Sequence, residues 1–314
     1  MYNSLTDKYY THSGKISIIN RKKTAKRIDY CACIVYNVRE IKSERTVITM
    51  IKLGVNSVLF KSFSFREAAQ AIALAGYDGV EISAIQGMCE HLCLDKWRIQ
   101  RSELLAITQE YNLPFLSTEV ASRDRQRLLT AFEACAELGI PVANIGSGGT
   151  TGDEESFKEA MEALAVSAQD AASFGVTLCC KAHVGAAVHD TATTLRMVEQ
   201  IGLTGFGVDM DPSHIHRAGE NPANELPKVI HAMKHIHIRD CRGDGPSPGE
   251  PALQACGRGD IDLMGYFKAM VDAGYCGPVC LEVIGPDQTM PCAQAIASES
   301  YGYMNACLKS LGAR

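Results

Sequence analysis

Several features are scarce or missing in this 314-residue sequence. It contains one tryptophan, no two cysteines in the Cys-x-x-Cys spacing of a thiolate zinc site, and no apolar run near the ~20 residues that span a bilayer. These absences argue against a transmembrane helix and against a cysteine-based zinc site. We therefore expect no contact with a membrane.

The excess of charge of one sign is also small. The formal net charge is -5, with 46% hydrophobic and 21% charged residues, so no strongly basic surface for nucleic acid is expected. The 13 cysteines are an odd number, and we expect no secretory leader, which together favour reduced thiols in the cytoplasm. A small molecule is the expected partner, and homo-oligomerisation is left open.

The first 49 residues differ in composition from the rest. They hold ten Lys and Arg against four Asp and Glu, whereas the remainder holds 21 against 32, a net charge of -11. A nucleic-acid arm or an organelle address would explain this segment, but no amphipathic period organises its charges, so a dispensable extension is favoured. We interpret residues 1–49 as a basic extension that is disordered or a mis-assigned start, with Met50 as the natural first residue.

From Met50 onward the pattern alternates between strand and helix eight times. The alternation predicts an α/β fold, a single (β/α)8 TIM barrel over residues 50–314 with strands apolar on both faces. An open doubly wound sheet is the second choice, since no glycine-rich phosphate turn follows the first strand. Predicted strands are 54–60, 79–83, 114–118, 142–145, 176–180, 205–209, 235–238 and 278–283, and predicted helices are 64–75, 95–111, 124–138, 156–174, 191–201, 222–233, 263–273 and 291–311.

Four of the later apolar runs end in groups that can hold a metal or move a proton. They end at or near Lys181, Asp211, His237 and Glu282. Parallel strands bring their carboxyl ends to one rim of a barrel, so we expect these side chains to form one site.

Three glycine-containing segments carry a family resemblance. Residues 257–262 (GRGDID) with 273–278 (AGYCGP) and Glu282, and residues 76–82 (GYDGVEI), resemble the sugar phosphate isomerase/epimerase family of xylose isomerase-like TIM barrels, within the AP endonuclease family 2 superfamily. The pairs Asp211-x-x-His214 and His237-x-x-Asp240 are similar to the sixth and seventh strand ends of that family, and the resemblance covers residues 50–311.

The resemblance implies a divalent metal, Mn, Co, Fe, Mg or Zn, at the carboxyl rim. In the family a Glu, an Asp, a His and a Glu from strands five to eight hold it, which corresponds here to Asp211, His237 and Glu282. The strand-five position is Lys181, whose ammonium would repel a cation.

The lysine leaves three interpretations open. In the first interpretation, the metal lies at a shifted position and gains His183 as a ligand. The period of two along a strand places His183 on the same face as Lys181. Alternatively the metal is absent, and Lys181 neutralises Asp211 and Glu282 or acts as a general acid or electrostatic clamp. The third interpretation is a rim lysine whose ammonium reaches solvent.

Other polar residues are predicted to bind substrate. Glu81 and Glu119 end the second and third strands, where a carboxylate is costly unless it has a partner. His214 and Arg217 follow the sixth strand, although His214 would equally serve as a helix cap. Arg239, Arg242 and Arg258 add cations near the rim, and the sequence selects none of them.

The resemblance and these residues predict an isomerase or epimerase of a sugar or polyol. Proton transfer next to a carbonyl would use Lys181, His183 and Glu282 as catalytic groups. A lyase of the same superfamily, such as an inosose-type dehydratase or a C-glycoside-cleaving enzyme, is the alternative, followed by a metal-free sugar-binding barrel. A DNA-repair nuclease is disfavoured by the acidic barrel.

Overall fold

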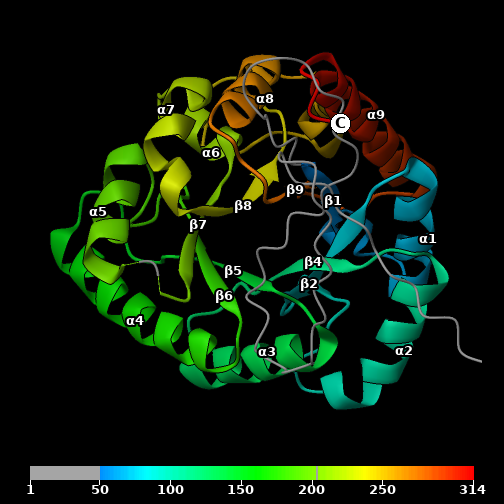
Figure 1. Ribbon diagram of the computed structural model, residues 1–314, viewed down its shortest axis with the longest axis horizontal. Helices are drawn as coiled ribbons and strands as arrows, with labels where there is room; N and C mark the ends of the chain where they lie inside the picture. The colour runs from blue at the N-terminus through cyan, green and yellow to red at the C-terminus, as the bar shows by residue number, and fades with distance from the viewer. Residues whose placement is uncertain (1–49, 203) are drawn as a thin grey trace, which may run out of the picture. The chain divides into compact units, whose positions relative to one another are not determined.

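Eight parallel strands form a closed barrel in the computed structural model, which describes residues 50–202 and 204–314 (Figure 1). Strand β1 closes the ring by pairing with both β2 and β9. The predicted (β/α)8 barrel is thereby confirmed. Its strands are β1 (Lys52–Asn56), β2 (Gly79–Ile85), β4 (Phe115–Glu119), β5 (Val142–Gly146), β6 (Thr177–Lys181), β7 (Phe206–Met210), β8 (Met233–Ile238) and β9 (Pro278–Leu281).

Helices surround this ring, and local sequence sets their ends. Ser64 and Glu67 form a capping box at the start of the first helix, and Gly76 ends it with a φ of 98° that a residue with a side chain rarely adopts. The outer helices are α1 (Phe65–Ala75), α2 (Trp97–Glu110), α3 (Arg125–Leu138), α4 (Glu154–Ser173), α5 (Thr191–Ile201), α7 (Pro222–Val229), α8 (Leu263–Asp272) and α9 (Met290–Ser310).

Some predicted boundaries were wrong for identifiable reasons. The first strand stops at Asn56, because the Asn56 side chain accepts a hydrogen bond from the Val58 amide and starts the short helix η1 (Ser57–Phe60). The helix predicted over 222–233 ends at Val229 and continues as η2 (Ile230–Ala232). Three further elements are too short to show a period in sequence. They are β3 (Cys89–Glu90), α6 (Pro212–Arg217) and η3 (Pro251–Gln254).

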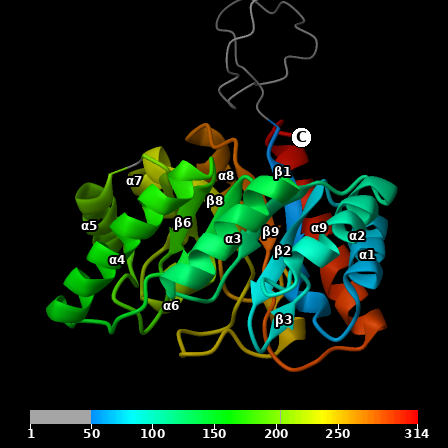
Figure 2. The ribbon, with the colours of Figure 1, turned by 90° about the horizontal axis from the view of Figure 1, so that it is seen from below.

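One end of the barrel is the carboxyl rim. Strand β3 follows the end of β2 and helix α6 follows the end of β7, and Figure 2 shows both at the edge opposite the C-terminus of the chain. Because the strands are parallel, every side chain at a strand's carboxyl end is delivered to this edge.

The inner and outer faces of the strands differ in polarity, which corrects the prediction that both faces are apolar. Outward residues such as Ile82, Ile236 and Leu281 are fully buried against the helices. The barrel interior is crossed by hydrogen bonds between strands, for example from Asn56 Nδ2 to Glu119 Oε2 at 2.7 Å and from Asn144 Nδ2 to Glu81 Oε1 at 2.6 Å. A polar interior that has no access to water must pair its own groups.

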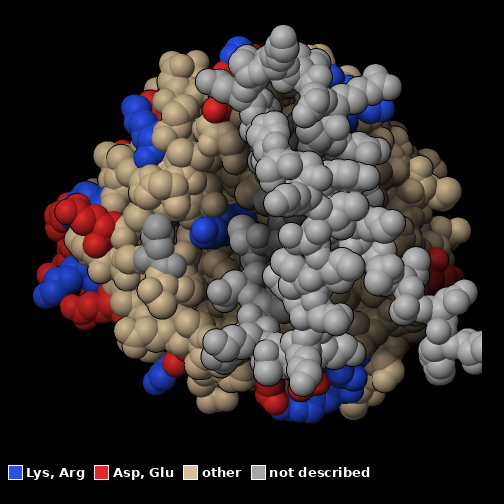
Figure 3. Space-filling model, in the orientation of Figure 1, with Lys and Arg blue, Asp and Glu red and all other residues tan. Residues whose placement is uncertain are grey.

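The outer surface carries interleaved charges of both signs. On the face shown in Figure 3, acidic and basic side chains alternate along the edge formed by α4 and α5. The ion pair between Arg196 and Glu154, at 2.7 Å, lies on these helices. No helix among the described residues has the length and apolarity needed to cross a bilayer. The predicted extension, residues 1–49, lies outside the described residues and stays a prediction.

Candidate active site

A lysine lies at the centre of the acidic groups inside the carboxyl rim. Lys181, the last residue of β6, places Nζ 2.8 and 3.0 Å from the two carboxylate oxygens of Glu282 and 3.4 Å from Glu119 Oε1. The same nitrogen lies 3.2 Å from His237 Nδ1. The Lys181 side chain is only 6% exposed, so its ammonium does not reach solvent. Burial alone would lower its pKa, but Glu119 and Glu282 outweigh burial and raise it, so Lys181 stays charged.

The two carboxyl groups bound to Lys181 differ in protonation. Burial and the neighbouring charge of Glu282 raise the pKa of Glu119 to about 8, so Glu119 holds a proton at neutral pH. Burial also opposes ionisation of Glu282, but Lys181 and Arg239 outweigh it and hold the pKa of Glu282 well below its usual range. A neutral acid and an ionised carboxylate side by side are suited to act as proton donor and proton acceptor.

His237 is held between two further carboxylates. Its Nε2 contacts Glu81 Oε2, and its Nδ1 lies 2.6 Å from Asp209 Oδ2. Burial would lower the pKa of His237, but Asp209 and Glu81 dominate and raise it well above the ordinary value. Carboxylate oxygens therefore lie beside both ring nitrogens of His237 and favour the protonated ring.

A second cation, Arg239, closes the cluster. Its NH2 donates to Asp211 Oδ2 at 2.8 Å, its NH1 lies 3.0 Å from Glu282 Oε2, and its Nε donates to Ser213 Oγ at 2.8 Å. Arg239 is 1% exposed. The structure thus selects Arg239 from the three arginines noted in the sequence, because Arg242 and Arg258 are exposed.

The remaining predicted residues lie closer to the mouth. His214 is buried, accepts a hydrogen bond from the Val184 amide at 3.2 Å and lies 2.9 Å from both Arg217 NH2 and Arg239 NH2. Burial, then Arg239, lower its pKa well below the ordinary value, so His214 is neutral. His183 is exposed, and its ring centroid lies 4.0 Å from that of His214. Strand β6 ends at Lys181, so the alternation that would align His183 with Lys181 does not continue.

Arg217 fixes the loop between β8 and α8. Its NH1 donates to Pro246 O at 2.8 Å, and its Nε donates to Ser213 O at 3.0 Å. Both of these contacts are with backbone oxygens of the chain itself. The structure therefore gives Arg217 a role in holding the mouth, beside the predicted role in substrate binding, which stays a prediction.

Donor groups of the types that bind a divalent metal are present. Glu119, His237 and Glu282 each offer one donor atom, and these atoms lie within 4.8 Å of one another. The predicted ligand Asp211 is not in this group, since it accepts hydrogen bonds from Ser213 and Arg239. The donor types agree with a metal site, but Lys181 Nζ already contacts all three donors, so a metal does not fit beside it.

Sequence reasoning missed Asp209. Its Oδ1 accepts hydrogen bonds from the backbone amide of His237 at 2.8 Å and lies 2.9 Å from His235 Nδ1. His235, which adjoins His237 one pleat deeper, is fully buried and lies 2.8 Å from Ser117 Oγ. A signal was available, because Asp209 is the last residue of the strand predicted over 205–209, and the carboxyl ends of the strands were expected to form the site.

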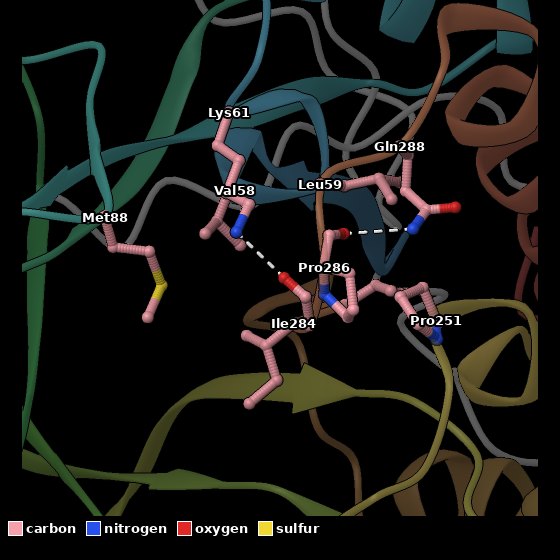
Figure 4. Close-up of a pocket in the computed structure, with 10 residues that line it drawn as sticks. Val58, Leu59, Lys61, Met88, Pro251, Ile284, Pro286 and Gln288 are labelled. Carbon is pink, nitrogen blue, oxygen red and sulfur yellow. Dashed lines mark hydrogen bonds between the residues drawn. The ribbon is translucent and has the colours of Figure 1, made fainter.

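A small pocket opens at the same rim beside η1 (Figure 4). Lys61 Nζ donates to Gly285 O at 2.8 Å and pairs with Asp287 at 3.2 Å, while Gln288 donates to Pro286 O at 3.0 Å. None of the predicted site residues lines this pocket. Its lining is Val58, Leu59, Lys61, Met88, Pro251, Val283, Ile284, Gly285, Pro286 and Gln288.

Comparisons with known proteins agree with the fold. The chain is 23% identical over 273 residues to inosose dehydratase of Clostridium botulinum, covering 77% of this chain and 90% of the relative. It is 25% identical over 252 residues to a putative L-ribulose-5-phosphate 3-epimerase of Escherichia coli, covering 74% and 88%. Both relatives are named as enzymes. The solved structure of the IolI protein with a bound zinc atom superposes with a TM-score of 0.69 at 18% identity, covering 83% and 99%.

A family model gives the broader assignment. The model described as xylose isomerase-like TIM barrel matches residues 63–307, which include every residue of the site described above. The match spans most of the barrel, as the resemblance in the sequence predicted. This chain therefore belongs to the xylose isomerase-like TIM barrel family.

Proposed function

We propose that this protein is an isomerase or epimerase that transfers a proton at a carbon next to the carbonyl of a sugar or polyol. The observation that carries the proposal is the pair Glu119 and Glu282, which both contact Lys181 Nζ, with the pKa of Glu119 raised and that of Glu282 lowered. Abstraction of such a proton needs a base, a proton donor and positive charge near the developing oxyanion.

Each of these parts has a candidate residue. Glu282 is ionised and serves as the base, and protonated Glu119 supplies a proton. Lys181 provides fixed positive charge beside both carboxyl groups and Arg239 beside Glu282, in a site that is closed to bulk water. Charge that is already oriented stabilises an enediolate without reorganisation during the reaction.

The mouth residues are assigned to substrate binding. Among the mouth residues, His183 is exposed. The buried His214 lies next to its ring and contacts Arg217. Imidazole and guanidinium groups suit the hydroxyls and oxyanions of a sugar or sugar phosphate. Glu81, which bonds Asn144 and His237 inside the barrel, is expected to act on substrate through His237.

A dehydratase is the second candidate. Protonated Glu119 adjoins ionised Glu282, so one residue could take the proton while the other protonates a departing hydroxyl. The similarity to an inosose dehydratase supports this reading, and the similarity to a 3-epimerase supports the first.

Deuterium exchange distinguishes these proposals. The protein is incubated in D2O with ketopentoses, ketohexoses, their phosphates and an inosose, and the products are followed by NMR and ultraviolet absorbance. Deuterium at the carbon next to the carbonyl, with a second sugar formed and no loss of water, is the expected result. Loss of water with a new conjugated carbonyl would identify the dehydratase instead.

A sugar-binding barrel without activity is tested by the same samples. Tight binding of a sugar by calorimetry, without exchange of deuterium or loss of water, would contradict both enzymatic proposals. The Glu282→Gln variant is the control, because removal of the base must abolish exchange that depends on this site.

A further inference from the structure

We propose that the ammonium of Lys181 occupies the position of a divalent cation in this barrel, so that the protein works without a metal at this site. The part that concerns metal binding stands on geometry alone. The part that concerns catalysis rests on the proposed function.

Nζ of Lys181 lies among the groups that would bind a metal. It lies 2.8 Å from Glu282 Oε1, 3.4 Å from Glu119 Oε1 and 3.2 Å from His237 Nδ1. A transition metal bound by the same groups would lie about 2.0–2.2 Å from each donor atom. The metal and the ammonium would then overlap, so the space among these donors holds one of the two cations.

The ring of His237 also has its nitrogen nearest these donors, Nδ1, covered by Lys181 Nζ at 3.2 Å. Its Nε2 contacts Glu81, and its Nδ1 lies 2.6 Å from Asp209 Oδ2. A histidine binds a metal through the lone pair of a neutral ring, and normally directs only one nitrogen to a carboxylate. Here both nitrogens lie beside carboxylate oxygens while Lys181 is in place, and Lys181→Glu would open the approach to Nδ1 from the side of the ammonium.

Lys181 and a second cation, Arg239, already place positive charge in this site. Arg239 pairs with Asp211 at 2.8 Å and with the second oxygen of Glu282 at 3.0 Å. Together with Lys181 it places two cations within a site whose groups are at least nine-tenths buried. A divalent ion would add two more positive charges beside them, in surroundings where like charges repel strongly.

Lys181 supplies a fixed positive charge to the proposed reaction. A protonated lysine holds Glu119 and Glu282 close together and offers one fixed positive charge to an oxyanion formed beside them. Unlike a metal, this charge is covalently attached and is not removed by a chelator. Turnover is therefore expected to be unaffected by chelators.

Metal content tests the inference without a substrate. Wild type, Lys181→Glu and Lys181→Met are dialysed against Mn²⁺, Co²⁺ or Zn²⁺, then against metal-free buffer, and analysed by plasma mass spectrometry. Thermal melting with and without each metal is the second readout. Lys181→Glu places a carboxylate at the position of the ammonium, and Lys181→Met removes the charge without adding a ligand.

The expected result is a trace of metal in wild type and about one ion per chain in Lys181→Glu, with a metal-dependent rise in its melting temperature. If Lys181→Glu does not fold, a metal-dependent rise in the melting of Lys181→Met, absent from wild type, supports the inference. About one ion per wild-type chain would overturn it. Folded variants that bind no more metal than wild type would also overturn it, because the donors would then not form a cation site.

The metal contents of the wild type and the two variants do not depend on the proposed function. Failure to find a substrate would leave the metal contents of the three proteins unchanged. Conversely, a wild-type protein that holds a metal and epimerises a sugar would retain the proposed function and refute the role of Lys181.

Discussion

The ammonium nitrogen of Lys181 lies 2.8 Å from Oε1 of Glu282, although the two residues are 101 positions apart and their strands, β6 and β9, are separated in the ring by β7 and β8. Both side chains are almost fully buried, at 6% and 3% exposure. A buried pair of this kind has lost its hydration, so each partner depends on the other. This dependence leads to the first two predictions.

Removal of the lysine charge should destabilise the fold. In Lys181→Met, measured with a chelator present, Glu282 and Glu119 lose their shared partner, and we expect a loss of about 3–5 kcal/mol in the free energy of unfolding. Urea denaturation followed by circular dichroism measures it. The matched control is Lys268→Met, which breaks the exposed pair with Asp272 and should cost less than about 1 kcal/mol. Equal losses in the two variants would contradict the prediction.

Neutralisation of Glu282 should abolish most of the activity. Once a substrate is found, Glu282→Gln is expected to lower kcat about 10²- to 10⁴-fold, because the ionised base is missing. Glu299→Gln, which alters an exposed glutamate paired with Arg258, is the control and should leave turnover unchanged. Melting curves establish that both variants are folded. Activity of Glu282→Gln within about threefold of wild type would exclude the role of general base.

His91 should make folding stability sensitive to acid. Its Nε2 lies 2.9 Å from Phe63 O, and burial lowers the pKa of the ring, so the folded chain holds it neutral. The unfolded chain protonates this residue near the ordinary value of about 6.5. Its contribution to stability is therefore complete above about pH 6.5 and decreases as the pH falls towards the lower pKa of the folded state.

The His91→Gln variant isolates this contribution. Below about pH 6.5 the wild type should lose stability more steeply than the variant, by at most about 1.4 kcal/mol per pH unit. Urea denaturation at a series of pH values measures the slopes. His231→Gln, at an exposed position, is the control. Parallel slopes for wild type and His91→Gln would refute the assignment.

Gly79 should not tolerate a methyl group. A Cβ on Gly79 would lie 2.6 Å from Leu116 Cγ and 2.7 Å from Pro114 O, at the amino ends of β2 and β4. We expect Gly79→Ala to cost about 1–3 kcal/mol by overpacking. Gly302→Ala is the opposite control, because Gly302 lies in α9 with open space around it, and alanine should stabilise the helix by about 0.5–1 kcal/mol. Thermal unfolding compares the two variants, and a neutral Gly79→Ala would show that Leu116 can move aside.

The sequence by itself determined the barrel. Short apolar runs, helical stretches and terminal glycines such as Gly76 and Gly139 repeat at regular intervals, and each of these signals is local. The boundaries predicted from the sequence were wrong where a short-range contact overrides the strand period. At Asn56, the side chain accepts a hydrogen bond from the Val58 amide, so β1 ends there and η1 begins. The sequence also identified Lys181 as the unusual residue of the rim.

Only the tertiary structure decided which charges meet. A register shift at Val208 and Asp209 pairs Asp209 with the histidines of β8 and leaves Asp211 to Arg239. Lys181 consequently pairs with Glu282, as one interpretation of the sequence expected, and with Glu119 in place of the expected Asp211. The physical reason is that ion pairing depends on distances across a closed ring, whereas a sequence pattern fixes only the strand and the face from which each side chain projects.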